Sequence, residues 1–222
     1  MNTTEKLRVI ITGVTGMVGE GVLLECLKDA RVEAVLIISR KPAGFEHPKL
    51  KCIVHKDFSD ISILENEVKN YNACFFCAGV TSIGKNEETF NHLTYDLTIG
   101  FATTLSKMNP GLVFCYVSGS GTDSSEQGKV MWARVKGKTE NRLKKLNFGA
   151  VYNFRPGYMQ PVSGSKYTIR AYYLFTWMYP ILKLLFPGFV CRLAEVGQAM
   201  IRVATEGYSK SEIEVREIVK LA

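Results

Sequence analysis

The stretch LRVIITGVTGMVGEG, residues 7–21, decides the fold of this chain. An apolar run ends at Gly13, and an amphipathic helical pattern begins directly after it. Three glycines stand between the two: Gly13 allows a tight turn, Gly16 lets the backbone approach a pyrophosphate, and Gly19 lets helix and strand pack closely. The helix N-terminus offers free N–H groups and a partial positive charge to phosphates. We therefore expect a dinucleotide contacted by Gly13, Thr15, Gly16, Met17, Val18 and Gly19.

Apolar runs alternate with helical patterns through the first 157 residues. The expected strands are 7–13, 33–40, 49–57, 73–79, 111–121 and 149–157, and the expected helices are 17–30, 60–70, 88–108 and 132–146. Asp60 is a candidate N-cap of the second helix. Strands that are apolar throughout and separated by helices are typical of a parallel sheet covered on both faces. Right-handed crossovers then make this an α/β, doubly wound parallel sheet of the Rossmann type.

The domain boundary is expected near residue 157. We predict a single NAD(P)-binding domain over 1–222, with a nucleotide-binding core at 1–157 and a C-terminal lid or substrate segment at 158–222. Residues 161–191 are irregular and apolar, and such a segment would cover the carboxyl ends of the strands, where ligands bind. Residues 193–205 favour a helix that packs on the sheet, and 211–222 favour a short strand with a helical turn.

The charge balance favours an anionic ligand. The formal net charge is +7 and the isoelectric point about 9.1. The basic residues are scattered, apart from a small cluster at Arg142, Lys144 and Lys145. Because no zinc knuckle, helix-turn-helix signature or interleaving of aromatic with basic residues occurs, we expect a phosphate-bearing small ligand and no nucleic acid.

The cysteines are expected to be structural thiols in a reducing compartment. Most of the six lie in apolar runs typical of buried strands. Cys74 and Cys77 form a C-x-x-C pair, but a strand would point them to opposite faces and no second pair completes a zinc site, so no metal is expected. The polar N-terminus, MNTTEK, does not have the pattern of a signal peptide, which favours a cytoplasmic location.

The end of the second expected strand selects between the two nicotinamide dinucleotides. A carboxylate there would bind the ribose 2′-hydroxyl of NAD. Ser39, Arg40 and Lys41 stand there instead, and an arginine fork suits the 2′-phosphate of NADP. The alternative is a solvated basic turn. Asp57, followed by Phe58, is placed to accept a hydrogen bond from the adenine amino group; its alternative is a turn or helix-cap carboxylate.

Residues 7–157 resemble the short-chain dehydrogenase/reductase superfamily, in particular its atypical, epimerase-like NAD(P)-binding members. The matching motifs are TGVTGMVG, HKDF, the strand end Cys77–Ala78–Gly79, VSGSG, WARVKGKTE and FRPG. The resemblance implies that Ser118, or else Ser120, bonds a substrate oxygen and that Lys136 holds the nicotinamide ribose. It also implies that Pro156 and Gly157 present backbone to the nicotinamide.

Trp132 departs from that resemblance, because the matching position in the family is a tyrosine that gives and takes a proton. An indole N–H is a hydrogen-bond donor but not an acid at useful pH. Tyr158, beside the expected nicotinamide turn, and Tyr95 are the alternative proton donors. The literal Y-x-x-x-K at Tyr179 is rejected, since it lies beyond the last core strand and Pro180 follows it.

Three functions follow from this departure. The first is an NADP-dependent reductase acting on a flat or apolar small molecule such as a flavin, a quinone or an activated alkene, with Trp132 stacked on it. The second is a catalytically weak NADP(H)-binding regulatory protein that works through a protein or membrane partner. The third is a scaffold in which Trp132 fills the former site.

Residues 172–189, YYLFTWMYPILKLLFPGF, have about the length of a membrane span. Lys183, Pro180 and Pro187 interrupt the segment, which argues against a span. A lid or a subunit interface over 170–190 fits better, with peripheral membrane contact as the alternative.

Overall fold

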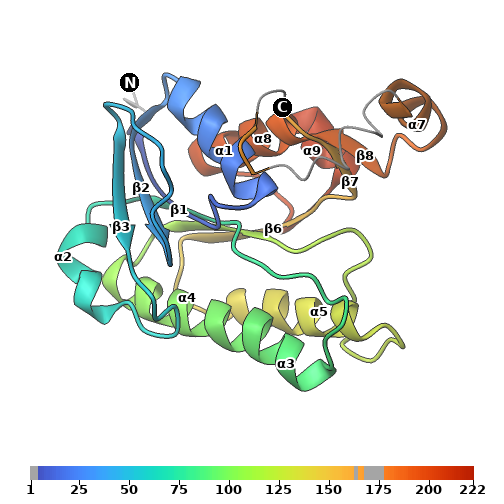
Figure 1. The fold of residues 1–222 in the computed structure, drawn as a ribbon, viewed down its shortest axis with the longest axis horizontal. Coiled ribbons are helices and arrows are strands. Elements are labelled where there is room, and N and C mark those ends of the chain that lie inside the picture. Colours follow the sequence, from blue (N-terminus) through green and yellow to red (C-terminus); the bar gives the residue numbers. More distant parts are fainter. Residues whose placement is uncertain (1–4, 163–164, 168–177) are drawn as a thin grey trace.

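The computed structural model describes residues 5–162, 165–167 and 178–222, and its centre is a seven-stranded sheet (Figure 1). The strand order is β3-β2-β1-β4-β5-β6-β9, and every neighbouring pair is parallel. The strands are β1 (Leu7–Thr12), β2 (Val32–Ser39), β3 (Leu50–Val54), β4 (Ala73–Phe76), β5 (Val113–Val117), β6 (Ala150–Arg155) and β9 (Glu212–Glu214). The chain order reverses between β1 and β4, which is the crevice where doubly wound sheets bind ligands.

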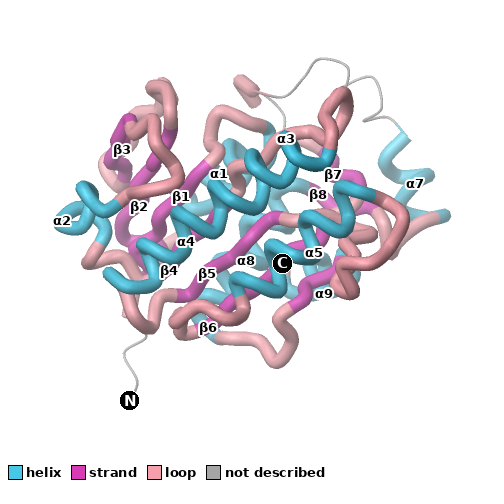
Figure 2. The backbone as a smooth tube through the Cα atoms, turned by 90° about the horizontal axis from the view of Figure 1, so that it is seen from below, coloured by secondary structure: helices cyan, strands magenta, loops and turns pink. Residues whose placement is uncertain are grey.

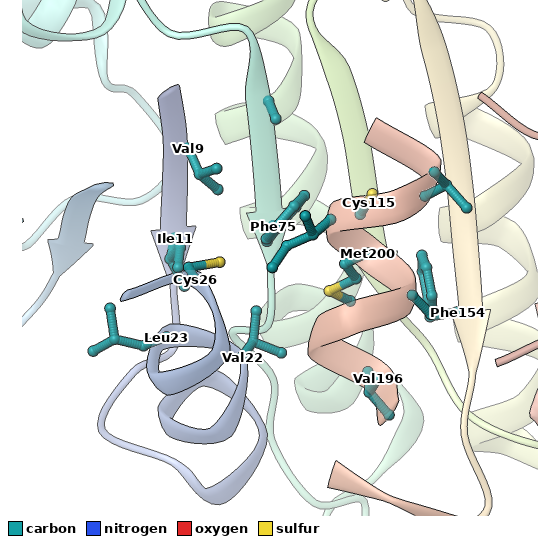
Figure 3. Packing of buried hydrophobic residues seen from close by; sticks show 14 of the residues in the cluster. Val9, Ile11, Val22, Leu23, Cys26, Phe75, Cys115, Phe154, Val196 and Met200 are labelled. Carbon is teal, nitrogen blue, oxygen red and sulfur yellow. The ribbon is translucent and has the colours of Figure 1, made fainter. Parts of the chain in front are cut away.

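Two hydrophobic cores lie on the two faces of this sheet, because successive side chains of a strand point to opposite sides. Ile11 and Phe75 enter one core, and their neighbours Ile10 and Phe76 enter the other. Figure 3 shows the first core, where Val22 of α1 and Met200 of α8 meet the sheet. Strands whose successive residues are all apolar therefore belong to a sheet that is covered on both faces, as predicted.

Helices form the two outer layers (Figures 1 and 2). α1 (Met17–Lys28), α8 (Leu193–Glu206) and α9 (Val215–Leu221) cover one face, and α3 (Glu87–Asn91), α4 (Leu97–Met108) and α5 (Met131–Leu143) cover the other. α3 and α4 are joined by a π-helical turn, His92–Asp96, so the long helix predicted over 88–108 contains an irregular turn. The helix predicted over 60–70 is shorter: a 3₁₀ turn, Ser62–Leu64, leads into α2 (Glu65–Val68). The N-cap of this turn is Ile61 and not the predicted Asp60. The Asp60 carboxylate instead accepts from the Ser62 N–H at 2.8 Å in the bend that precedes the turn.

The C-terminal residues 193–221 belong to the sheet layers rather than to a lid. α8 packs on α1 at close range, because a Cβ on Gly21 would overlap the Leu193 side chain and one on Gly197 would lie 2.9 Å from the Glu25 Cβ. β9 then extends the sheet beside β6. Residues 193–221 therefore pack with the predicted nucleotide-binding core, although they lie beyond the predicted boundary at residue 157.

Between residues 158 and 192 the described chain forms a small arm. It comprises β7 (Tyr158–Gln160), α7 (Tyr179–Leu185) and β8 (Val190–Arg192), with β7 and β8 paired in parallel. Of the apolar stretch predicted as a lid or interface, 170–190, residues 170–177 lie outside the described residues. In the parts that the structure describes, no helix is long and apolar enough to cross a membrane.

The edge strand β3 departs from the expectation of buried cysteines. Cys52 lies on β3 and is exposed, whereas Cys26, Cys74, Cys115 and Cys191 are buried. β3 pairs only with β2, so its outer edge faces solvent and Val54 keeps 49% of its surface exposed. Cys74 and Cys77 do point to opposite faces of the sheet, as predicted for a strand.

Candidate nucleotide-binding site

A cleft of about 870 Å³ opens at the carboxyl ends of the strands, within the size range of about 300–1,000 Å³ typical of ligand pockets. It contains all the predicted cofactor contacts except Gly157; their roles remain predictions. Its described wall consists of Gly13, Thr15, Gly16, Met17, Val18, Gly19, Ser39, Arg40, Lys41, Lys56, Asp57, Phe58, Phe76, Cys77, Ala78, Gly79, Val80, Leu93, Leu97, Thr98, Val117, Ser118, Lys136, Pro156 and Met159.

The glycine turn forms the floor of this cleft. Gly13 has a φ of +74°, and a Cβ there would lie 2.5 Å from the Ala78 nitrogen and 2.6 Å from the Cys77 carbonyl carbon. A Cβ on Gly19 would overlap the Gly13 carbonyl oxygen, so the third glycine brings α1 against the turn. Gly16 differs, because a Cβ there would meet only the Gly13 oxygen, at 3.5 Å. Positions 13 and 19 thus need glycine for packing, while Gly16 leaves open space at the start of α1.

Three cations stand where β2 and β3 end. Arg40 and Lys41 are exposed on the cleft wall, and Lys56 joins them from the neighbouring strand end. The Ser39 hydroxyl donates to the Lys41 carbonyl at 2.5 Å and so shapes the turn. Lys56 was missed by the sequence analysis, although its place beside Asp57 at a strand end was the available signal. These three cationic side chains make this end of the cleft suitable for binding an anion.

Asp57 lies on the same wall, but one of its oxygens is already engaged. Oδ1 accepts from the Ser59 N–H at 2.8 Å and from the Ser59 hydroxyl at 2.5 Å. These bonds lower the pKa of the Asp57 carboxyl. The Asp57 carboxylate thus stabilises the local turn, which was the alternative to an adenine contact. Asp57 nevertheless lines the cleft.

A buried polar network forms the inner end of the cleft. The Ser118 hydroxyl donates to the Glu140 carboxylate at 2.5 Å and lies 3.1 Å from the Phe154 carbonyl. Glu140 is fully buried, and it also accepts from Arg155 at 2.5 and 3.1 Å. Because the Ser118 hydroxyl donates its proton to Glu140, it can act toward a ligand as a hydrogen-bond acceptor. Sequence reasoning did not identify Glu140 or Arg155.

Lys136 completes the inner end. Its ammonium group donates to the Ser118 carbonyl oxygen. Burial lowers the pKa of Lys136 to about 8, and the nearby Glu140 carboxylate opposes that change in part. Lys136 can therefore exchange a proton near neutral pH.

Several candidates from the sequence do not line the described cleft. Trp132 packs toward the Gly121 turn, with its ring 3.6 Å from the position of a Cβ there. Neither Tyr158 nor Ser120 is on the wall, so of the two candidate serines the structure brings only Ser118 to the cleft. Tyr95 packs under the Lys138 ammonium group at 4.1 Å.

Gly157 also lies off the wall. A Cβ on it would overlap the Phe189 carbonyl oxygen, so this glycine accommodates the β7–β8 arm. Met159, which the sequence analysis did not select, reaches the cleft from that arm. Among the described residues, no cluster of metal-ligating side chains occurs.

Comparison with known proteins gives a consistent result. The model of the NAD dependent epimerase/dehydratase family matches residues 9–127. The chain is 28% identical over 148 residues to Protein FMP52-2, mitochondrial, of Scheffersomyces stipitis, which covers 66% of this chain and 64% of that protein. The matched stretch spans about half to two thirds of the length of the curated relatives.

Two solved structures share the fold. The enzyme WbmF of Bordetella bronchiseptica, in complex with NAD⁺, superposes with a TM-score of 0.68 at 16% identity, covering 100% of this chain and 78% of that one. A short chain dehydrogenase from Burkholderia cenocepacia, in complex with NADP, superposes with a TM-score of 0.67 at 14% identity, covering 98% and 92%. Proteins of this fold thus include binders of either dinucleotide.

Proposed function

The chain belongs to the NAD-dependent epimerase/dehydratase family, and from that premise we propose that it binds NADP(H) and acts as a reductase-like protein of the atypical short-chain dehydrogenase class on a small-molecule substrate. One observation carries the proposal: the glycine turn, the cations Arg40, Lys41 and Lys56, and Lys136 all face one cleft. A dinucleotide needs phosphate donors at its middle, which the glycine turn would provide. It needs different partners at its two ends, which would be the cations at the adenosine end and Lys136 at the nicotinamide end.

The residues present fit such a cofactor. α1 is 12 residues long, and its first turn, Met17, Val18 and Gly19, lines the cleft, where the N–H groups of a helix start lack intrahelical partners. The open space at Gly16 admits a phosphate close to the backbone. At the adenosine end, Arg40 would hold a 2′-phosphate with support from Lys41 and Lys56.

When bound, NADPH supplies the hydride chemistry. The chain would contribute at the inner end. Lys136 holds a proton on Nζ, and its pKa of about 8 lets it release that proton near neutral pH. Ser118, with its own proton directed to Glu140, would accept a hydrogen bond from the ribose or the substrate. This arrangement supports a proton donor other than the usual tyrosine.

Cofactor choice is tested by fluorescence titration with NADPH and NADH. We expect the native protein to prefer NADPH. Arg40→Ala should weaken NADPH binding about 10- to 100-fold and NADH binding far less, because a hydrogen bond to a charged group contributes about 1.5–3 kcal/mol. Arg142→Ala is the matched control, since Arg142 is exposed and lies off the cleft. Equal losses for both nucleotides in Arg40→Ala would contradict the assignment.

A catalytically weak NADP(H)-binding regulatory protein is the second candidate. The observation in its favour is that the cleft wall contains no tyrosine among the residues that the structure describes. NADPH oxidation in the presence of quinones, flavins and aldehydes separates the two functions. Tight binding without turnover, unchanged in Trp132→Tyr, would favour the regulatory protein.

A further inference from the structure

The described chain exposes an apolar tip, residues 180–189, which comprises most of α7 and the turn that follows it. Nine large apolar side chains are strongly exposed in the described chain, and five of them lie in this tip: Ile181, Leu184, Leu185, Phe186 and Phe189. Leu184 keeps 82% of its surface exposed. Single exposed apolar residues are ordinary, but this clustering within nine residues marks an interaction surface.

The tip is anchored at both ends and projects between them. Tyr179, directly before it, is 4% exposed, and Val190, directly after it, is 1% exposed. The Tyr158 N–H donates to the Phe189 carbonyl at 2.9 Å, which fixes the end of the tip to β7. In both views α7 lies at an outer end of the molecule, away from the main sheet layers (Figures 1 and 2). A projecting surface of this kind is suited to insertion into a partner rather than to receiving a partner in a groove.

Charge separates the candidate partners. The tip and the β-strand that follows it, residues 180–192, contain two cations, Lys183 and Arg192, and no aspartate or glutamate. The acid that faces the tip from a neighbouring element is Glu195, which is largely buried, lies 3.6 Å from the Lys183 ammonium group and accepts from the Arg192 N–H. The Arg216 guanidinium lies beside Gly188. The surroundings of the tip are therefore cationic toward solvent.

We propose that the apolar tip docks onto the surface of an anionic lipid bilayer. Exposed Leu and Phe side chains bury in the boundary between headgroups and acyl chains, and neighbouring cations pair with anionic headgroups. A second copy fits less well, because pairing two such tips would bring like charges together.

The place of the tip bears on substrate access, a consequence that rests on the proposed function. β8 follows the tip and pairs with β7, whose Met159 lines the cleft. Docking would thus hold the expected nicotinamide end of the cleft close to the bilayer. A flat, apolar substrate that partitions into lipid would have a short path to it.

Vesicle co-sedimentation tests the docking, with the full chain and no nucleotide added, so that its outcome is independent of cofactor binding. We expect binding to vesicles of phosphatidylcholine with phosphatidylserine, weaker binding to phosphatidylcholine alone, and loss of the difference at high salt. Leu184→Glu should weaken binding about tenfold or more, because a buried leucine is replaced by a charge.

Ile63→Glu is the matched control, since Ile63 is 78% exposed and lies far from the tip in the 3₁₀ turn before α2. Circular dichroism confirms that both variants fold. Three results would overturn the proposal: no sedimentation of the native chain, equal loss in Ile63→Glu, or a concentration-dependent dimer that Leu184→Glu dissociates while no vesicle binding is seen.

Discussion

Alanine substitutions at Gly44 and at the three glycines of the glycine turn separate backbone strain, close packing and ligand contact, because the structure places each effect on a different glycine. Gly44 has a φ of +62° and nothing within 4 Å of a Cβ, so Gly44→Ala adds only conformational strain. Placing a residue other than glycine in this left-handed backbone conformation costs about 1–2 kcal/mol. Gly44→Ala is therefore the control for strain alone.

Gly19→Ala isolates packing. Gly19 has no positive φ, yet its Cβ would lie 2.5 Å from the Gly13 carbonyl carbon and 2.8 Å from the Val14 nitrogen. Backbone atoms cannot rotate away, so α1 must shift, and overpacking of this kind typically costs about 1–3 kcal/mol. Gly13→Ala combines both effects, and we expect it to lower the free energy of unfolding by about 2–5 kcal/mol.

Urea denaturation followed by circular dichroism measures these differences. Total stabilities of about 5–15 kcal/mol leave such variants foldable but clearly shifted. We expect Gly13→Ala to be the least stable of the three. If Gly13→Ala loses no more than Gly44→Ala, then the strand end at Cys77–Ala78 yields to the added methyl group, and the close approach of β1 to β4 does not require glycine.

Gly16→Ala completes the series from the functional side. Its Cβ would meet one atom at 3.5 Å, so we expect the free energy of unfolding to change by less than about 1 kcal/mol. The same methyl group would occupy the space that we assign to a phosphate, and NADPH affinity should fall at least about tenfold. Unchanged NADPH affinity in a folded Gly16→Ala variant would show that the phosphates bind elsewhere.

Three further predictions concern the inner end of the cleft and the thiols. Glu140→Ala should lower the free energy of unfolding by about 3–5 kcal/mol, since it leaves Arg155 without its buried partner; a loss below about 1 kcal/mol in urea denaturation would contradict this. The folded-state pKa of Lys136 lies below its unfolded value, so its burial opposes folding at neutral pH and ceases to do so as pH rises from about 8 to 10.5. The difference in unfolding free energy between the native chain and Lys136→Met should change by up to about 3 kcal/mol over that window, and a pH-independent difference would refute the assignment. Ellman's reagent should label Cys52 rapidly in the native chain and the other cysteines only after denaturation. Cys77 is the most sensitive comparison, because burial raises the pKa of its thiol to about 12 and so slows its reaction. Rapid labelling of more than one thiol in the native chain would contradict this prediction.

The fold class and most of the residues that line the cleft could be predicted from the amino-acid sequence. Apolar runs such as VIIT and VLIIS alternate with helical patterns, and only a parallel sheet covered on both faces buries both sides of such strands. The spacing of Gly13, Gly16 and Gly19 located the turn, because close approach of backbone leaves no room for a side chain at two of these positions. The family match over residues 9–127 confirms the resemblance to epimerase-like NAD(P)-binding proteins.

The grouping of polar side chains at the inner end of the cleft depends on tertiary packing. Ser118 directly follows β5, Glu140 lies on α5 and Arg155 lies on β6. No local pattern predicts that their side chains share one buried network. The same holds for Lys56, which reaches the cations beyond β2 because β2 and β3 pair in parallel, and for the position of Trp132 off the cleft wall. Local periodicity determines which face of an element is buried, whereas contacts between distant elements depend on strand order and helix packing, which a single sequence leaves open.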